Sequence, residues 1–525
     1  MIRRTGGGLF GRGAKAMAVV LASAFALSAC GSGTAGSDQK TPAATKSDTI
    51  TATVAYASRD FAPATTSGAL PLAGNWHVVE PLYALDYSTF EVFDSLADGD
   101  PEQVSDTEYV VTLRDGAKFS DGTDVTPADV VKSYERTTAE GSLYITMLDF
   151  IDSVEAKGDN QVVFKLKYAF PMFKQRLALI RVTPASASDD DLKKMPIGSG
   201  PWKYVEITDQ QVKFEKNDQY NGDYPAQTEK MTWNIKVDDT ARITEMQAGK
   251  TDVMEMVPAN AFTTLENSGS EMKTTQGFNQ AFIMFNTKKK PFDDKRVRQA
   301  VFYAIDVDKL IKDSMLGQAE AATSYLPESF PYYHKAKNVY TKDLDKAKAL
   351  LAEAGVTDTV KFTLYTTDAT WITSLAPQIK NDLAEIGFDV DVQSLASAAL
   401  YPNVADKDDF SMILAPGDPS VFGNDPDLLM NWFYGDNAWT QKRTHWKESE
   451  AFTELHQYMD SALAATSDDE RQEQWNKCYD LLSEELPLYP LFHRKTTTAV
   501  KKGVFSTYDP IGSTGLNFLK AKLAE

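Results

Sequence analysis

The chain has 525 residues, of which 42% are hydrophobic and 24% are charged. Its formal net charge of −20 argues against nucleic acid as a partner, because such a surface repels phosphates. Two cysteines, Cys30 and Cys478, are too few for a disulfide-stabilised scaffold, and the length suits two or three domains.

The N-terminal segment predicts an export signal. Residues 16–30 read AMAVVLASAFALSAC and follow a stretch with four basic and no acidic side chains. The apolar run is too short for a membrane anchor, so we predict a signal peptide over residues 1–29. Its end, Leu27-Ser28-Ala29-Cys30, resembles the lipobox of bacterial lipoproteins, which implies cleavage before Cys30 and lipidation of its thiol. The alternative is an ordinary secretory signal with an incidental cysteine.

Lipidated Cys30 would anchor the protein outside the cytoplasm, at the outer face of the cytoplasmic membrane or in the periplasmic space. Residues 30–48 are almost free of apolar side chains and predict a flexible tether. This tether contains Gly31-x-Gly33-x-x-Gly36, which matches a dinucleotide-binding fingerprint, but no strand precedes it and no helix follows it. We therefore expect no nucleotide cofactor.

The remaining chain predicts interleaved strands and helices, and hence a mixed α/β fold. In chain order, we expect a strand at 108–113, a helix at 127–134, a helix at 294–315, a helix at 344–354, a strand at 362–365, a helix at 375–386 and a strand at 388–392. Cys478 shares a helix face with Trp475 and Leu482, which favours a buried structural thiol.

Several segments point to one family. The run from Tyr109 to Arg136, YVVTLRDGAKFSDGTDVTPADVVKSYER, resembles the signature of extracytoplasmic solute-binding proteins of the peptide/nickel class of ABC importers. Further segments are similar to the same family in the same order: GSGPW (198–202), NDQYNG (217–222), DDTAR (238–242), MQAGKTDV (246–253), PFDDKRVRQAVFYAID (291–306) and DKAKALLAEAG (345–355). Most of them are turns and helix starts, so they identify the scaffold and not the ligand.

The resemblance to this family, bacterial solute-binding protein family 5, implies a two-lobed α/β periplasmic-binding-protein fold with a hinge and an additional third domain. Lobe I would be discontinuous, lobe II would be a single segment, and strands near 282–286 and 496–500 would form the hinge. The predicted boundaries are 49–84, 198–284 and 496–525 for lobe I, 85–197 for the extra domain, and 285–495 for lobe II.

The resemblance also implies a function. The protein would capture an oligopeptide or dipeptide between its lobes and deliver it to ABC permease subunits with cytoplasmic ATPases, as a monomer and without a cofactor. An oligosaccharide or a nickel or other metal chelate is the alternative ligand. An extracellular enzyme or a structural lipoprotein is the alternative class, but the sequence has no nucleophile elbow, Walker loop or HExxH, so we predict no enzymatic activity.

Asp418 is the main candidate for ligand contact. Peptide-binding members use an aspartate for the ligand's α-ammonium, and the segments APGD (415–418) and NDPD (424–427) look similar to the segment that carries it. We predict that Asp418, beside Gly417, makes this charge-assisted hydrogen bond. The alternative is an Asx-turn next to Pro419. The extra segment 419–423 departs from the family pattern and leaves the registration open.

Other candidates are aromatic or basic. Aromatic side chains are dense between Trp432, Trp439 and Trp446, where they form either a stacking wall for the ligand or the packing of a loop. Asn75 and Trp76 are a second candidate for contact across the cleft, and Arg443 is the candidate for the ligand's carboxylate.

A dedicated metal site is not predicted. No two of the five histidines are spaced as i and i+4, and no run of His and Cys occurs. His445, beside Trp446, is the residue that could contact a metal chelate from a loop.

Overall fold

The computed structural model describes residues 48–140 and 142–525. The predicted signal peptide and Cys30 lie outside these residues, and the described residues form one compact unit. In the described chain, strands from the whole length of the sequence join one 11-stranded sheet, in the order β15-β14-β16-β12-β17-β11-β1-β10-β9-β8, with β13 also paired to β17.

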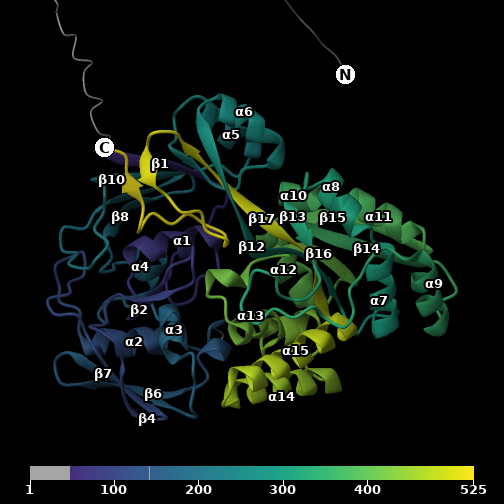
Figure 1. Cartoon of the computed structure of the whole chain (residues 1–525), viewed down its shortest axis with the longest axis horizontal. Helices are drawn as coiled ribbons and strands as arrows, with labels where there is room; N and C mark the ends of the chain where they lie inside the picture. The colour runs from purple at the N-terminus through teal and green to yellow at the C-terminus, as the bar shows by residue number, and fades with distance from the viewer. Residues whose placement is uncertain (1–47, 141) are drawn as a thin grey trace, which may run out of the picture. The chain divides into compact units, whose positions relative to one another are not determined.

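The sheet has two halves on either side of a long central pair of strands (Figure 1). The β1 half, as we call it, contains β1 (Thr49–Val54), β8 (Trp202–Ile207), β9 (Gln211–Lys216), β10 (Lys230–Ile235) and β11 (Val253–Met254). The β14 half contains β13 (Ala319–Ala321), β14 (Val360–Thr367), β15 (Phe388–Leu395) and β16 (Met412–Gly417). Within each half the central strands are parallel, since β1 pairs with β10 and β11, and β14 pairs with β15 and β16.

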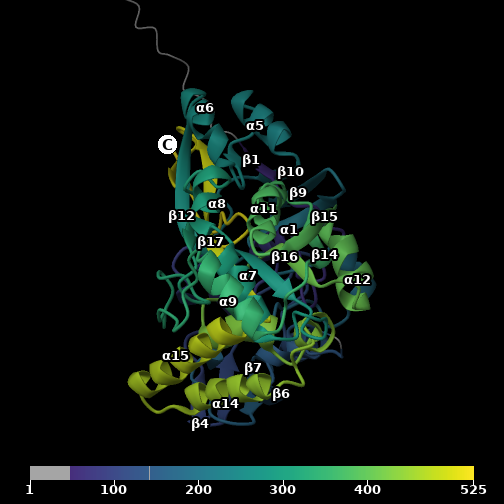
Figure 2. The ribbon, with the colours of Figure 1, turned by 90° about the vertical axis from the view of Figure 1, so that its right-hand side faces the viewer.

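The central ribbon consists of β12 (Ser270–Phe285) and β17 (Leu488–Lys501), which are antiparallel and paired along nearly their whole length. The two strands lie side by side in both views (Figures 1 and 2). One end of the ribbon pairs with β11 of the β1 half, and the other end pairs with β16 of the β14 half. The predicted crossing strands near 282–286 and 496–500 therefore fall on this ribbon.

The pairing in the ribbon is interrupted near its middle. Gln276 lies opposite Lys495 and Gln280 lies opposite His493, so four steps along β12 correspond to two steps along β17. A second register shift follows between Ala281 and Phe282. Such irregularities disrupt the ladder locally and increase its twist.

Helices cover both halves. The β1 half has α1 (Ala69–Val78), α4 (Asp189–Lys194), α5 (Asp239–Gln247) and α6 (Phe262–Asn267). The β14 half has α7 (Lys295–Ala304), α8 (Val307–Asp313), α9 (Leu344–Glu353), α10 (Thr370–Thr373), α11 (Ala376–Ala384), α12 (Ser397–Asn403), α13 (Pro426–Tyr434), α14 (Glu450–Ala464) and α15 (Asp468–Glu485). Cys478 is fully buried on α15, as its helix face predicts.

One predicted helix is divided. The apolar spacing predicts a single helix over 294–315, whereas the structure has α7 and α8 with Ile305 in an extended conformation between them. Asp306 begins the second helix, because its carboxylate accepts a hydrogen bond from the backbone nitrogen of Lys309. The N-cap carboxylate thus restarts the helix although the apolar periodicity continues.

A second, separate sheet lies within residues 85–197, the predicted extra domain. Its strands are β4 (Glu102–Ser105), β5 (Glu108–Thr112), β7 (Gln161–Leu166) and β6 (Ile151–Lys157), in that order, with α2 (Pro127–Thr137) against β6 and β7. The short pair β2 (Tyr83–Leu85) and β3 (Val92–Asp94) precedes it, and α3 (Phe173–Arg176) follows it. The exact domain boundaries stay a prediction.

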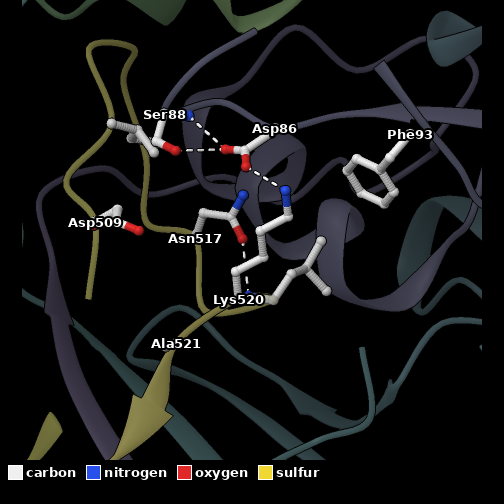
Figure 3. A pocket seen from close by; sticks show the side chains of 9 residues that line it. Asp86, Ser88, Phe93, Asp509, Asn517, Lys520 and Ala521 are labelled. Carbon is white, nitrogen blue, oxygen red and sulfur yellow. Dashed lines mark hydrogen bonds and ion pairs between the residues drawn. The ribbon is translucent and has the colours of Figure 1, made fainter. Parts of the chain in front are cut away.

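The C-terminal segment, residues 502–525, contains the antiparallel pair β18 (Phe505–Thr507) and β19 (Lys522–Leu523), one strand near each of its ends. It returns to the first part of the chain, where the Lys520 ammonium donates to Asp86 Oδ2 at 2.5 Å (Figure 3). Asp86 Oδ1 accepts from the backbone nitrogen and the hydroxyl of Ser88, so both oxygens of this carboxylate have donors. The pocket around it has a volume of only about 20 Å³ and holds at most a water-sized guest. No helix among the described residues is long and apolar enough to cross a membrane.

Candidate functional site

A cavity of about 620 Å³ lies between the two halves of the large sheet. Its wall includes Ala55 and Tyr56, which directly follow β1, and residues 368–371, which directly follow β14. Pro416 at the end of β16 also lines it. Ligands of open α/β sheets bind outside the carboxyl ends of the strands, and three parallel strands end at this cavity. We therefore take it as the candidate binding site.

The ribbon forms the floor between the two halves, with Arg494, Lys495 and Thr497 of β17 on the cavity wall. The Arg494 guanidinium carbon lies 4.8 Å from the centroid of the Trp371 ring, which comes from α10. Arg494 is only 7% exposed, and its Nη1 has no hydrogen-bond partner within the described chain. Burial lowers the pKa of this guanidinium and Arg242 adds to the shift, whereas the charges of Tyr56, Asp239 and Glu255 oppose it.

The other two cations of the wall are already paired. Arg242 contacts the Asp239 carboxylate and donates to the backbone oxygens of Lys236 and Val237. The Lys495 ammonium lies 3.2 Å from Glu320. Arg494 is thus the lining cation for which the described residues supply neither an ion pair nor a full set of acceptors.

Four aspartates also line the cavity: Asp238, Asp239, Asp313 and Asp368. Behind the wall, buried Glu255 accepts a hydrogen bond of 2.8 Å from the backbone nitrogen of Ala55. Burial raises the pKa of Glu255, although this hydrogen bond and Arg242 oppose the shift. Burial likewise raises the pKa of the lining residue Tyr56 to about 12, so its hydroxyl stays protonated at neutral pH. The cavity therefore presents both signs of charge to a ligand.

The two halves also supply exposed apolar side chains. Val237 of the β1 half is 62% exposed and Leu316 of the β14 half is 51% exposed, and both line the cavity. Leu316 and the lining residue Met256 have positive φ values of 49° and 54°, a backbone conformation that residues other than glycine rarely adopt. Strained backbone of this kind clusters at ligand sites.

None of the eight predicted ligand contacts, all of which are described, lines this cavity. Asp418 comes nearest in sequence, two residues after Pro416. Its Oδ1 accepts from the nitrogen and hydroxyl of Ser420 (3.2 and 2.5 Å), and its Oδ2 accepts from the nitrogen and hydroxyl of Thr514 (2.7 and 2.8 Å). Burial raises the pKa of Asp418, and these hydrogen bonds oppose the shift. Four donors already occupy the acceptor positions of the carboxylate.

Close packing requires glycine at position 417. A Cβ at this position would approach Phe433 Cζ to 2.6 Å, so a larger residue would displace an aromatic ring of the core. Its neighbour Asp418 is the N-terminal residue of a short turn, because it caps the nitrogen of Ser420. The alternative that predicts an Asx-turn at Asp418 thus has direct structural support, whereas the ligand role stays a prediction.

Asn75 and Trp76 lie on helix α1 and are buried. Asn75 donates to the Phe61 carbonyl oxygen and accepts from the Tyr204 hydroxyl, and Trp76 stacks on Tyr87 with ring centroids 3.9 Å apart. Both line a pocket of about 20 Å³ that Val421 and Phe422 of the β14 half close from the other side. This pocket admits a water but not a peptide.

The downstream aromatic candidates pack within the β14 half. Trp439 is buried against Phe282 and Phe433, and Trp432 contacts Phe422. Arg443 stacks on Tyr401 and Trp439 and donates to Asp406 at 2.8 Å. The packing alternative therefore accounts for these side chains, and the guanidinium of Arg443 already has a carboxylate.

His445 has a carboxylate neighbour as well, since its Nε2 lies 3.2 Å from Asp408. Among the described residues, no three His, Cys, Asp or Glu side chains are placed to hold a metal ion. The residues that line the cavity, above all Arg494 and Trp371, are missing from the prediction. They lie 123 positions apart in sequence, so only the order of strands in the sheet brings them together.

Comparison with known proteins gives this geometry a context. Residues 91–441 match the family model "Bacterial extracellular solute-binding proteins, family 5 Middle". The chain is 27% identical over 461 residues to the oligopeptide-binding protein AppA of Bacillus subtilis, covering 78% of this chain and 80% of AppA. It is 26% identical over 432 residues to the glutathione-binding protein GsiB of Escherichia coli, covering 79% of this chain and 83% of GsiB.

The fold is also found in solved structures. The periplasmic binding protein DppA of Helicobacter pylori, in complex with the peptide STSA, superposes with a TM-score of 0.81 at 22% identity, over 91% of this chain and 98% of DppA. The predicted two-lobed α/β periplasmic-binding-protein fold is thereby confirmed. The family model and AppA are those of binding proteins, in agreement with the prediction of a binding protein rather than an enzyme. Because the family model matches more than half of the sequence, the chain belongs to the bacterial extracellular solute-binding proteins of family 5, the peptide/nickel class that serves ABC importers.

Proposed function

We propose that this protein captures short peptides in the 620 Å³ cavity and delivers them to the permease of an ABC importer. The observation that carries the proposal is the position of the cavity, at the carboxyl ends of β1, β14 and β16 and above the ribbon that joins both halves. A solute there contacts both halves at once. It therefore favours whichever arrangement of the halves provides both sets of contacts.

Peptides are the proposed solutes for two reasons. AppA and GsiB, to which the chain is similar, are oligopeptide- and glutathione-binding proteins. In addition, the cavity combines Arg494, four aspartates and exposed apolar side chains, which suits a ligand with two charged ends and side chains between them. Its volume lies within the range of small-molecule sites, roughly 300–1,000 Å³, so we propose short rather than long peptides.

The protein would work outside the cytoplasm as a monomer, held at the membrane by lipidated Cys30. The support for the anchor is the lipobox-like sequence Leu27-Ser28-Ala29-Cys30. Replacing Cys30 by Ser is expected to release the protein from the membrane fraction, which cell fractionation measures. Retention of the Cys30→Ser protein in that fraction would contradict the anchor.

Thermal unfolding of the chain without residues 1–30 tests the ligand class, because a ligand that binds only the folded form raises the midpoint. We expect di- to pentapeptides to raise it, and neutral oligosaccharides and nickel chelates to leave it unchanged. A shift with sugars or chelates alone would overturn the peptide proposal.

A further inference from the structure

We propose that Arg494 binds a carboxylate of the solute, with the Trp371 ring as the platform that holds the guanidinium in place. This inference deepens the proposed function, because it assigns a chemical group of the ligand to one residue of the same cavity. It names a role for a side chain that the family resemblance did not predict.

The first argument is the missing partner. Arg494 is more than nine-tenths buried, lines the cavity and has an Nη1 without any acceptor in the described chain. The carboxylates of Asp239 and Glu255 act on Arg494 through their charge, but neither forms an ion pair with it among the described residues. A buried charge is costly unless it is paired and hydrogen-bonded. An anion supplied by the ligand would remove this cost, because it would provide both the charge and the acceptors.

The second argument is the geometry of the stack. The guanidinium carbon lies over the Trp371 ring, 4.8 Å from its centroid, and this cation–π contact is not a conventional hydrogen bond. A guanidinium offers its donors in its own plane, in a fork that fits both oxygens of a carboxylate. The contact with Trp371 therefore holds the guanidinium without supplying an acceptor to Nη1.

The third argument is the surrounding charge. Of the three lining cations, Arg242 and Lys495 already contact Asp239 and Glu320. The four aspartates on the wall repel a carboxylate from the rest of the cavity. A zwitterionic peptide would therefore bind in one direction, with its carboxylate at Arg494.

The test compares peptides that end in a carboxylate with the same peptides ending in an amide, using isothermal titration calorimetry. The wild-type chain without residues 1–30 is expected to bind the acids at least tenfold more tightly. Arg494→Gln should lose at least tenfold in affinity for the acids and bind the amides as the wild type does. Trp371→Leu should weaken binding of the acids selectively, whereas Lys495→Gln, a cation on the same wall with its own partner, should leave the preference intact.

The outcomes separate the two proposals. Equal binding of acids and amides by the wild type would overturn the role of Arg494 but not the peptide proposal, and this comparison stands even where Arg494→Gln fails to fold. If no peptide of either form binds, the peptide proposal fails. In that case, the affinities for carboxylated and neutral sugars are compared. Tighter binding of the carboxylated sugars that Arg494→Gln abolishes would support the inference, and equal binding of both would overturn it.

Discussion

Asp418 joins two distant segments of the chain. It follows β16, and both donors of Thr514 in the C-terminal segment bind its Oδ2. For Asp418 to bind the α-ammonium of a peptide, these donors would have to move away, since the carboxylate has about four acceptor positions in all. The structure therefore supports a role for Asp418 in holding the C-terminal segment against the β14 half.

A substitution distinguishes the two roles of Asp418. Asp418→Asn places an amide donor against donors of Ser420 or Thr514, so we expect the free energy of unfolding to fall by about 1–3 kcal/mol. Thr514→Val removes one donor and keeps the backbone N–H, so its loss should be smaller. Urea unfolding measures both. Unchanged stability of Asp418→Asn, together with lost discrimination against N-acetylated peptides, would instead support the ammonium role.

Residues whose contacts come from distant parts of the chain were the hardest to assign from sequence. Arg443 was proposed for the ligand's carboxylate, and the structure shows that Tyr401, Trp439 and Asp406 already hold its guanidinium. Arg494 gave no such signal, because the sequence around it reads as one more buried strand. A long-range pair such as Arg494 and Trp371 follows from strand order, which local patterns do not contain.

At the scale of elements, a buried ion-pair cluster joins α3 to the start of α13. Arg176 is 1% exposed and its Nη2 lies 2.6 Å from Asp425 and 2.7 Å from Asp427. Asp425 also caps α13 through the backbone nitrogen of Leu428. One cluster thus fixes both the helix terminus and its contact with the region that contains the four-stranded sheet.

Removing Arg176 should be costly, because it leaves two carboxylates buried without their counter-charge. We expect Arg176→Met to lower the free energy of unfolding by about 3–5 kcal/mol, and Asp427→Asn in the same chain to restore part of it. Lys361→Met, which breaks the exposed pair with Asp389, is the control and should cost less than about 1 kcal/mol. Equal losses in urea unfolding for Arg176→Met and Lys361→Met would contradict this account.

Helix α1 is joined to the C-terminal segment through a histidine. His77 Nδ1–H donates to the Ala73 carbonyl oxygen, and His77 Nε2 accepts from the backbone nitrogen of Phe518 at 2.9 Å. A proton on Nε2 would remove the acceptor. Burial lowers the pKa of His77 to about 4, and the nearby charge of Arg181 adds to this effect, while the Ala73 hydrogen bond opposes it.

The direction of the pH effect follows from this shift. The unfolded chain takes up a proton near pH 6.5, whereas the folded chain resists it down to about pH 4, so stability should decline as the pH falls through this range. We expect urea unfolding to show a steeper decline for the wild type than for His77→Gln. Partly exposed His334→Gln is the control and should follow the wild type. Parallel curves for the wild type and His77→Gln would contradict the assignment.

Most elements could be predicted from sequence, because each depends on neighbouring residues. The strands at 108–113 and 388–392 and the helix ended by Gly355 match β5, β15 and α9 closely. The helix at 294–315 was predicted in one piece, since apolar spacing continues through the point where Asp306 begins α8. The candidate site was harder to predict from the sequence, because its wall combines side chains from β17, α10 and the loops after β1 and β14.

At the scale of the whole molecule, ligand exchange should require the two halves to separate at the cavity. Val237 and Leu316 line this cavity from opposite halves and are well exposed, so we choose these positions for two cysteines and a set of bis-maleimides of graded length. Cys478 is fully buried and should not react.

Bridging before ligand is added should block binding, and bridging after loading should retain the ligand through dialysis. The thermal midpoint of the ligand-free protein should not fall on bridging, because the bridge adds a constraint without removing a contact. Calorimetry and dialysis measure these effects, with Val237→Cys and Leu316→Cys alone as controls. Free exchange of ligand in the bridged protein would show that this part of the cavity is not the route of entry.

The interrupted register of the central ribbon has a consequence for affinity. Both connections between the halves that run through the sheet pass the stretch from Gln276 to Gln280, where Gly277 lies so close to Gly512 that a Cβ would overlap its carbonyl oxygen. Substitutions that stiffen or loosen this stretch would alter the fraction of molecules ready to bind, and the apparent dissociation constant scales inversely with that fraction. Substitutions at this position would then change the affinity for the transported solute without any contact between the substituted residue and the solute.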